Sequence, residues 1–201
     1  MRDAAIEVEH LSKRVAVGFF GRKVSLLDDV TFTVARGSTT GFVGKNGAGK
    51  STTIKHIIGG SSPDKGAVRV WGGDPRTTSV RRRFGYMPEL PYLPPTLTPA
   101  EMMRLHASLC GAGADKIGAL LERVDLRDAR DKRIGSFSKG MQTRLTLALA
   151  LLHEPDLLIL DEPMSGLDPV GRQLVRMMLR EQSALGRTIF FSSHVLADVE
   201  A

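Results

Sequence analysis

Apolar and polar residues alternate along two segments near the N-terminus of this chain. The alternation covers residues 6–8 and 30–35, where valine, isoleucine and phenylalanine take every second position. A period of two is that of a strand with one buried face. Two later segments, 157–160 and 188–191, are instead apolar almost without interruption. Such runs are typical of parallel strands covered on both faces, so we predict an N-terminal antiparallel part and a mainly parallel central sheet.

The middle of the chain carries a pattern that predicts helices. Five prolines crowd residues 88–99, so this stretch is expected to be an extended connector. It ends in Thr98-Pro99-Ala100-Glu101, which is typical of a capping box with proline at the first helical position. Helices are expected to follow through Leu105 and Leu109, then over 117–124 and over 141–152.

Strands and helices that alternate in the second half of the chain predict an α/β fold. A length of 201 residues suits one domain that is large enough to bury a hydrophobic core. We expect an α/β core of about residues 1–89 and 156–201, with a helical lobe of about residues 90–155 inserted into it.

The segment from Gly44 to Ser51 fits the phosphate-binding pattern G-x-x-x-x-G-K-S/T, with a predicted strand before it and a helix after it. Glycines let successive N–H groups point at phosphate oxygens, and the helix N-terminus adds partial positive charge. Lys50 is expected to reach the β- and γ-phosphates, and the Ser51 hydroxyl to ligate Mg²⁺. The predicted nucleotide-binding residues of this loop are Gly44, Lys45, Asn46, Gly47, Ala48, Gly49, Lys50, Ser51 and Thr52.

Two acidic residues, Asp161 and Glu162, follow the apolar run over 157–160. Ligands of α/β sheets bind beyond the carboxyl ends of the strands, where the phosphate-binding loop would also lie. Asp161 is therefore expected to hold Mg²⁺ directly or through water, since this cation prefers oxygen ligands. Glu162 is expected to orient and polarise an attacking water. The alternative is an acidic cap on the turn that follows.

Ser138 fits the N-cap of an amphipathic helix whose apolar positions include Leu145 and Leu149. A capped helix start with glycine nearby is also a good anion site. Spacing alone favours an ordinary helix cap over a ligand site.

Composition and charge add few candidates. The net charge is +6, but the basic residues are scattered apart from 81–83, so no direct nucleic-acid partner is expected. Cys110 is the only cysteine; it excludes an internal disulfide, suits a reducing compartment and is expected only to pack. With no signal-peptide pattern and no apolar run long enough for a membrane span, we expect a cytoplasmic chain. His10, His56, His106 and His153 show no metal-ligand spacing and are expected to be structural.

Taken together, the motifs resemble the nucleotide-binding domain of an ABC (ATP-binding cassette) transporter over essentially the whole chain. The segment 44–51 resembles its Walker A loop, and 160–163 (Leu-Asp-Glu-Pro) resembles Walker B. The segment 137–142 (Phe-Ser-Lys-Gly-Met-Gln) resembles the ABC signature in a form typical of bacterial exporter subunits. The segment 165–168 resembles the D-loop, and 192–194 the end of the strand that carries the switch histidine, His194.

This resemblance implies an ATPase, with ATP and Mg²⁺ as ligands, that powers transport through a separate transmembrane permease. It implies a position on the inner face of the cell membrane through that permease. Two such domains, as a homodimer or as paired ATPase subunits, would hold two ATP molecules between them. Ser138 and Gly140 would then contact the γ-phosphate held by the partner's loop, and His194 the γ-phosphate in its own subunit. Catalysis is thus expected to depend on Lys50, Glu162 and His194.

The sequence departs from the family pattern at several positions. The residue expected to stack on adenine is usually aromatic, but Val15 stands here, unless Phe19 or Phe20 takes over. The Q-loop position carries Glu89, which is expected to bind Mg²⁺ or water, together with Ser51 and Asp161. Family members usually continue after the histidine, so a C-terminal truncation at Ala201 is expected, and such a truncation would weaken hydrolysis and pairing.

Two alternatives remain open from the sequence. One is an ABC-type ATPase acting on ribosomes or nucleic acid, although the chain has one cassette and no heptad repeat between Lys50 and Asp161. The other is a non-catalytic, truncated ATP-binding module. A GTPase is disfavoured because no N-K-x-D motif is present. The transported substrate and the direction of transport do not follow from these residues.

Overall fold

Two sheets and the helices around them make up the fold in the computed structural model, which describes residues 4–18 and 22–196. The strands are β1 (Ala4–Val17), β2 (Arg22–Ala35), β3 (Thr39–Val43), β4 (Lys65–Val70), β5 (Phe84–Met87), β6 (Leu157–Leu160) and β7 (Thr188–Ser193). The helices are α1 (Lys50–Ile57), α2 (Thr78–Arg81), α3 (Pro99–Cys110), α4 (Lys116–Arg123), α5 (Lys139–Leu151) and α6 (Pro169–Ala184), with short 3₁₀ helices η1 (Arg127–Ala129) and η2 (Ile134–Ser136).

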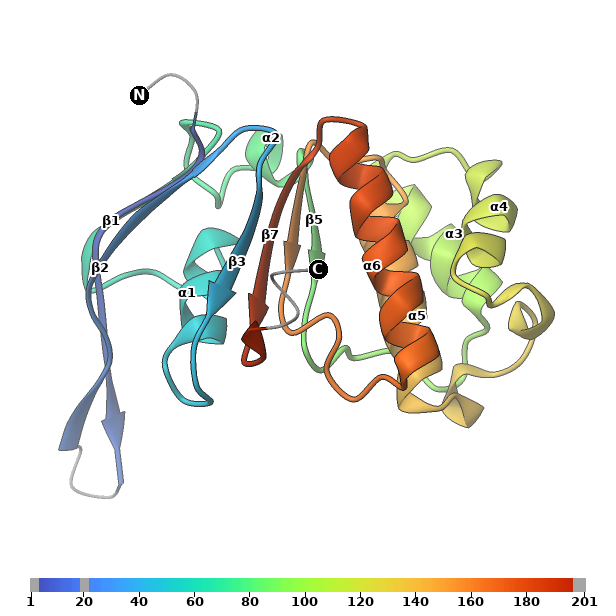
Figure 1. Cartoon of the computed structure of the whole chain (residues 1–201), viewed down its shortest axis with the longest axis horizontal. Helices are drawn as coiled ribbons and strands as arrows, with labels where there is room; N and C mark the ends of the chain where they lie inside the picture. The colour runs from blue at the N-terminus through green and yellow to red at the C-terminus, as the bar shows by residue number, and fades with distance from the viewer. Residues whose placement is uncertain (1–3, 19–21, 197–201) are drawn as a thin grey trace.

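The two sheets lie on either side of α1 (Figure 1). The antiparallel sheet has the order β2-β1-β4, and the parallel sheet has the order β3-β7-β6-β5. Helices α5 and α6 lie on the far side of the parallel sheet, with α3 and α4 beyond them (Figure 1). This arrangement confirms the predicted fold class: a parallel central sheet, an N-terminal antiparallel part and inserted helices.

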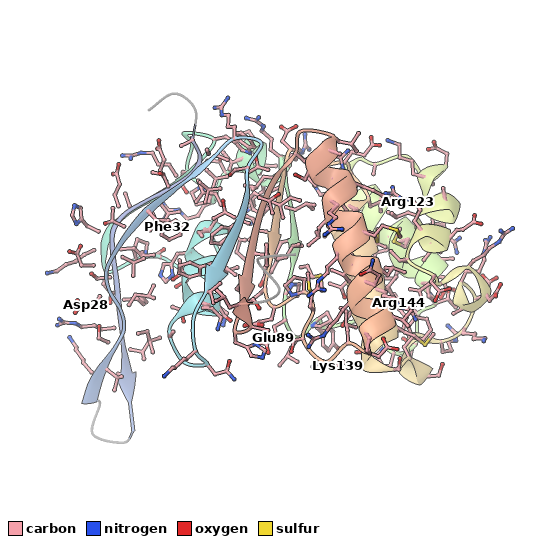
Figure 2. The ribbon with its side chains drawn as sticks, in the orientation of Figure 1. Asp28, Phe32, Glu89, Arg123, Lys139 and Arg144 are labelled. Carbon is pink, nitrogen blue, oxygen red and sulfur yellow. The ribbon has the colours of Figure 1, made fainter. Side chains whose placement is uncertain are left out.

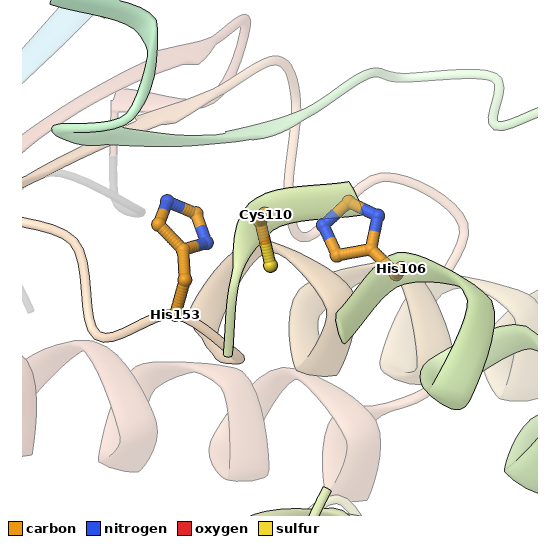
Figure 3. A group of neighbouring side chains, drawn as sticks. All are labelled: His106, Cys110 and His153. Atoms are coloured by element: carbon orange, nitrogen blue, oxygen red, sulfur yellow. The ribbon is translucent and has the colours of Figure 1, made fainter. Parts of the chain in front are cut away.

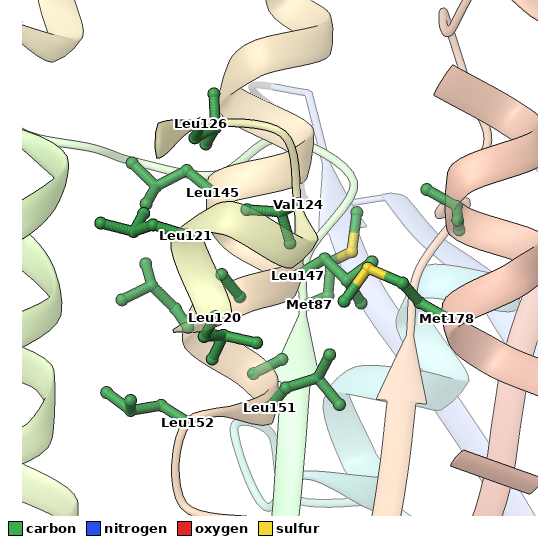
Figure 4. Close-up of a cluster of buried hydrophobic side chains, with 14 of the residues drawn as sticks. Met87, Leu120, Leu121, Val124, Leu126, Leu145, Leu147, Leu151, Leu152 and Met178 are labelled. Carbon is green, nitrogen blue, oxygen red and sulfur yellow. The ribbon is translucent and has the colours of Figure 1, made fainter. Parts of the chain in front are cut away.

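The unbroken apolar runs of β6 and β7 supply side chains to two separate cores. Successive residues of a strand point to opposite faces of its sheet. Leu157, Ile159 and Phe190 pack with α1 and the antiparallel sheet. Their neighbours Leu158, Leu160 and Ile189 join a second cluster with the helices. Figure 4 shows part of this cluster. Burial on both faces explains why these strands lack the polar alternation of β1 and β2.

Local capping patterns predicted the caps of α3 and α5 correctly. The Thr98 hydroxyl accepts a hydrogen bond from the Glu101 amide at 3.2 Å, and the Glu101 carboxylate accepts one from the Thr98 amide at 2.8 Å, which completes the capping box. Ser138 Oγ likewise accepts from the Met141 amide at 3.2 Å and caps α5. Both interactions join residues three positions apart, so a short sequence window specifies them.

The prediction that α5 is amphipathic is wrong. From Thr143 to Leu151 every residue except Arg144 is buried. Helix α5 contacts β5, α3, α4 and α6, so it is covered on all sides, and a helix in that position is apolar all round.

Helices α3, α4 and α5 lie between β5 and β6 in the sequence, and their core is continuous with one face of the parallel sheet. The division into an α/β core and a helical lobe stays a prediction. Among the described residues, no helix has the length and apolarity needed to cross a bilayer.

Candidate functional site

The phosphate-binding pattern lies in a loop between β3 and α1, at the carboxyl ends of the parallel strands. Gly47 has φ +83° and Gly49 has φ +91°, a region that side-chain-bearing residues rarely adopt. A Cβ atom at Gly49 would lie 2.6 Å from Leu27 Cδ2 and 2.9 Å from the Leu26 carbonyl oxygen. Glycine at position 49 is therefore required both by backbone angle and by space, whereas Gly47 faces open space.

Lys50 folds back over this loop and is buried. Its ammonium donates to the carbonyl oxygens of Gly44 at 2.6 Å and Lys45 at 3.3 Å. It also lies 3.2 Å from Glu162 Oε1, and the two side chains are only 7% and 8% exposed. The cation is thus held at the loop by two backbone oxygens and one carboxylate.

Glu162 connects this lysine to His194. The second carboxylate oxygen, Glu162 Oε2, lies 2.8 Å from His194 Nδ1, which comes from the end of β7. Glu162 also has a φ of +51°, an unusual angle for a residue with a side chain. Such backbone strain is found mostly where the surrounding structure needs a side chain in one particular place. Lys50, Glu162 and His194, far apart in the sequence, therefore form one contiguous polar chain.

Ser192, to which the sequence patterns assign no role, organises the acidic pair Asp161 and Glu162. Its hydroxyl donates to Asp161 Oδ1 at 2.7 Å and accepts from the Glu162 amide at 2.9 Å. The side chain is fully buried in β7. The sequence feature that could have indicated this role is the polar pair Ser192-Ser193 at the carboxyl end of an otherwise apolar strand. The carbonyl oxygen of Ser193 accepts a hydrogen bond from the Gly44 amide at 3.2 Å.

Asp161 is buried beside Tyr86 of β5. Its amide donates to the Met87 carbonyl oxygen at 2.8 Å, which continues the parallel ladder. Burial raises the pKa of Tyr86 to about 12, and the Asp161 charge adds to the rise. Tyr86 therefore stays a neutral phenol next to the carboxylate at physiological pH.

A cavity of about 310 Å³ opens at the loop. Figure 2 shows Glu89 toward the edge to which the arrows of the parallel strands point. The residues that line the cavity supply hydroxyl and carboxylate oxygens, backbone amides and a buried ammonium, a combination that suits a magnesium-bound phosphate chain. The lining residues are Leu26, Asn46, Gly47, Gly49, Lys50, Ser51, Thr52, Glu89 and Glu162.

Ser138 and Gly140 are not among the residues that line this cavity. They lie at the start of α5 against the segment 165–168 instead. A Cβ atom at Gly140 would lie 3.5 Å from Leu167 Cδ2, and one at Gly166 would lie 2.7 Å from Lys139 Nζ. The signature motif thus contacts the D-loop motif of its own chain.

Two further predictions concern the position expected to stack on adenine and the histidines and cysteine expected to be structural. Val15 lies half-buried in the β1–β2 hairpin, paired with Val24, while Phe19 and Phe20 lie outside the described residues. His106 and His153, expected to be structural, and Cys110, expected to pack, lie together: their potential ligand atoms are all within 4.8 Å of one another. Sequence spacing did not reveal this group because His153 comes from a different element.

Comparison with known proteins gives consistent matches. The sequence profile of the family described as ABC transporter matches residues 27–165. The chain is 38% identical to a Nod factor export ATP-binding protein I of Paraburkholderia xenovorans, over 100% of this chain and 66% of that protein. Curated relatives are longer: the chain spans 57% to 66% of the length of three of them.

Solved structures agree with these matches. One described as the ATP-binding subunit of an ABC transporter has a TM-score of 0.85 and 39% sequence identity, covering 98% of this chain and 82% of that chain. The dimeric structure of MJ0796, a bacterial ABC transporter cassette, shares the fold at a TM-score of 0.87 with 21% identity, covering 97% of this chain and 90% of that one. The chain belongs to the ABC transporter family, because the family profile matches residues 27–165 and the chain has the same fold as a solved ATP-binding subunit that is 39% identical to it.

Proposed function

We propose that this chain binds ATP with Mg²⁺ and hydrolyses it to power transport of a substrate through a separate membrane permease. The observation that carries the proposal is the Lys50–Glu162–His194 chain beside the phosphate-binding loop. It joins a cation suited to phosphate, a carboxylate suited to water and a histidine at the strand end. Phosphoryl transfer needs such positioning and charge neutralisation more than covalent chemistry.

In the structure, the charge of Lys50 is compensated by Glu162 and two carbonyl oxygens. A triphosphate is a stronger counter-ion, so we propose that Lys50 exchanges Glu162 for the β- and γ-phosphates when ATP binds. That exchange leaves the carboxylate of Glu162, still in contact with His194, to orient the attacking water. Ser51, Asp161 and Glu89 would hold Mg²⁺, which supplies charge neutralisation along the phosphate chain.

Pairing of two ATPase domains would complete the site. Ser138 and Gly140 lie outside the cavity of their own chain, at the start of a 13-residue helix whose exposed amides suit an anion. We propose that they contact the γ-phosphate bound by the partner, on the inner face of the membrane beside the permease. The name of the Nod factor relative favours export for this chain, while leaving its substrate open.

Replacement of Glu162 by Gln tests the proposal. The amide keeps the shape of the side chain but cannot act as a base, so E162Q should bind ATP, accumulate as an ATP-bound dimer and lose about 100-fold or more in phosphate release. Glu122, an exposed residue that pairs with Arg127, gives the matched control E122Q, which should keep wild-type turnover. Undiminished turnover in E162Q would remove Glu162 from the proposed role.

Two alternatives make different predictions from the transport ATPase. An ATPase that acts on ribosomes or nucleic acid would have a different partner, and a non-catalytic ATP-binding module would show no turnover. Co-purification with the product of a neighbouring permease gene supports transport. Phosphate release that rises tenfold or more with ribosomes or DNA would favour the first alternative. ATP binding without any phosphate release in the wild type would favour the second.

A further inference from the structure

Three potential metal-ligating side chains meet at the end of the molecule opposite the nucleotide site. His106 and Cys110 lie one turn apart on α3, and His153 lies in the link between α5 and β6 (Figure 3). In Figure 3 the Cys110 sulfur lies between the two imidazoles. The three potential ligand atoms are all within 4.8 Å of one another, and each residue is half-buried. None of them takes part in the proposed ATPase site.

The hydrogen bonding of His153 leaves one ring nitrogen available. His153 Nε2 lies 3.2 Å from the carbonyl oxygen of Phe84. A carbonyl oxygen only accepts, so Nε2 carries the proton and Nδ1 keeps its lone pair in the neutral ring. Nδ1 is buried and has no hydrogen-bond partner among the described residues. A histidine whose second nitrogen donates to a backbone carbonyl is oriented as metal-ligating histidines commonly are.

The surroundings of His106 and His153 favour the neutral form of both imidazoles. Burial lowers the pKa of His106, and repulsion from His153 lowers it further. Burial also lowers the pKa of His153, with Arg187 adding to the effect, while the bond to Phe84 opposes it. Neutral imidazole is the form that ligates metals. The charge of Arg187 opposes a bound cation, whereas a Cys110 thiolate would compensate part of that cation's charge.

We propose that His106, Cys110 and His153 form a binding site for a single Zn²⁺ ion, with the fourth position open to solvent. Two imidazole nitrogens and one thiolate suit zinc, whereas Mg²⁺ and Ca²⁺ require oxygen ligands. Zinc–ligand bonds of about 2.0–2.3 Å place tetrahedral ligands roughly 3.3–3.8 Å apart. Because the three atoms already lie within 4.8 Å of one another, side-chain rotations need to shorten their separations by at most about 1.5 Å. Binding releases the thiol proton to solvent and forms a Zn–S bond, with no change of oxidation state.

A metal here would add a direct link between α3 and the loop that carries His153, which is far from α3 in the sequence. It would tie α3 to the α5–β6 link and, through the carbonyl of Phe84, to the start of β5. These are the amino ends of parallel strands, whereas the phosphate-binding loop lies at their carboxyl ends. The site is thus independent of ATP, and its occupancy would hold the helices against the sheet.

Titration of the metal-free 201-residue chain with Co²⁺, in excess Mg²⁺, tests the proposal. We expect one Co²⁺ per chain, a thiolate-to-cobalt charge-transfer band in the near ultraviolet, and loss of that band when Zn²⁺ is added. Zn²⁺ at about 100-fold over its dissociation constant should raise Tm by roughly 5–10 °C. Zn²⁺ should also slow alkylation of Cys110, which is the only thiol in the chain.

Variants locate the site. C110A and H106Q should each lose the band and weaken Zn²⁺ binding by about 100-fold or more, since loss of partners outside the coordination shell alone costs 10–100-fold. H10Q is the matched control, because His10 is exposed and pairs with Asp29, and it should bind as the wild type does. No charge-transfer band in the wild type, or equal Zn²⁺ affinity in C110A, would overturn the proposal whether or not the chain hydrolyses ATP.

Discussion

Lys50 and Glu162 form a buried ion pair, with 3.2 Å between Nζ and Oε1. Removal of one charge from a buried pair leaves the other uncompensated. We expect K50M to lower the free energy of unfolding by about 3 kcal/mol in urea denaturation, the lower end of the usual range because His194 still contacts Glu162. ATP affinity should fall by about tenfold or more, as a charge-assisted contact to phosphate is lost.

A double-mutant cycle separates the pair from other effects. K50M/E162Q should be more stable than K50M, because no unpaired carboxylate remains. The control K116M removes a lysine whose partner, Glu154, is on the surface, and it should cost less than about 1 kcal/mol. Strict additivity of the two single changes would contradict a coupled pair.

Ser192 offers a second test, because its hydroxyl serves both acidic residues. S192A leaves the buried Glu162 amide without its acceptor and removes a donor from Asp161. We expect a loss of about 1–3 kcal/mol in unfolding free energy and lower Mg²⁺-dependent phosphate release. S108A, at an exposed serine whose hydroxyl donates to the Leu105 carbonyl oxygen of its own helix, should change stability by less than about 0.5 kcal/mol. Equal effects in the two variants would remove Ser192 from the site.

Ser138 and Thr98 are matched helix caps with different expected roles. Each accepts from a backbone amide three residues on, at 3.2 Å, so S138A and T98A should each cost about 1 kcal/mol of stability. Only S138A should also weaken ATP-dependent pairing, measured by sedimentation in the E162Q background. If T98A impairs pairing as strongly, the loss reflects helix stability and not a contact with the partner's ATP.

Acidification should destabilise the protein through His106 and His153. Their pKa values are lowered in the fold, first of all by burial, so the unfolded chain binds more protons and stability falls as pH drops below about 6.5. Urea unfolding between pH 7.5 and 5.5 should show this slope, and H106Q should reduce it. Hydrogen bonds from Arg76 and Thr98 lower the pKa values of Asp74 and Glu101. The stability that these two carboxylates contribute is therefore lost only at lower pH than that of the histidines. An unchanged slope in H106Q would contradict the assignment.

Much of the fold follows from short-range patterns. Several features depend on residues within a few positions of one another. They are the caps at Thr98 and Ser138, the backbone angles of Gly47 and Gly49, and the start of α1 after the loop. The prediction of an amphipathic α5 was wrong because the sequence does not show how many elements pack against this helix. In the structure β5, α3, α4 and α6 all contact it.

The sequence by itself determined the strand–loop–helix around Lys50, the capped helices and the acidic pair at the end of β6, because each is encoded by neighbouring residues. Only the tertiary structure decided that Glu162 contacts both Lys50 and His194, that Ser192 bonds to Asp161, and that His153 meets His106 and Cys110. Those contacts join residues more than thirty positions apart, and strand order and helix packing set their distances.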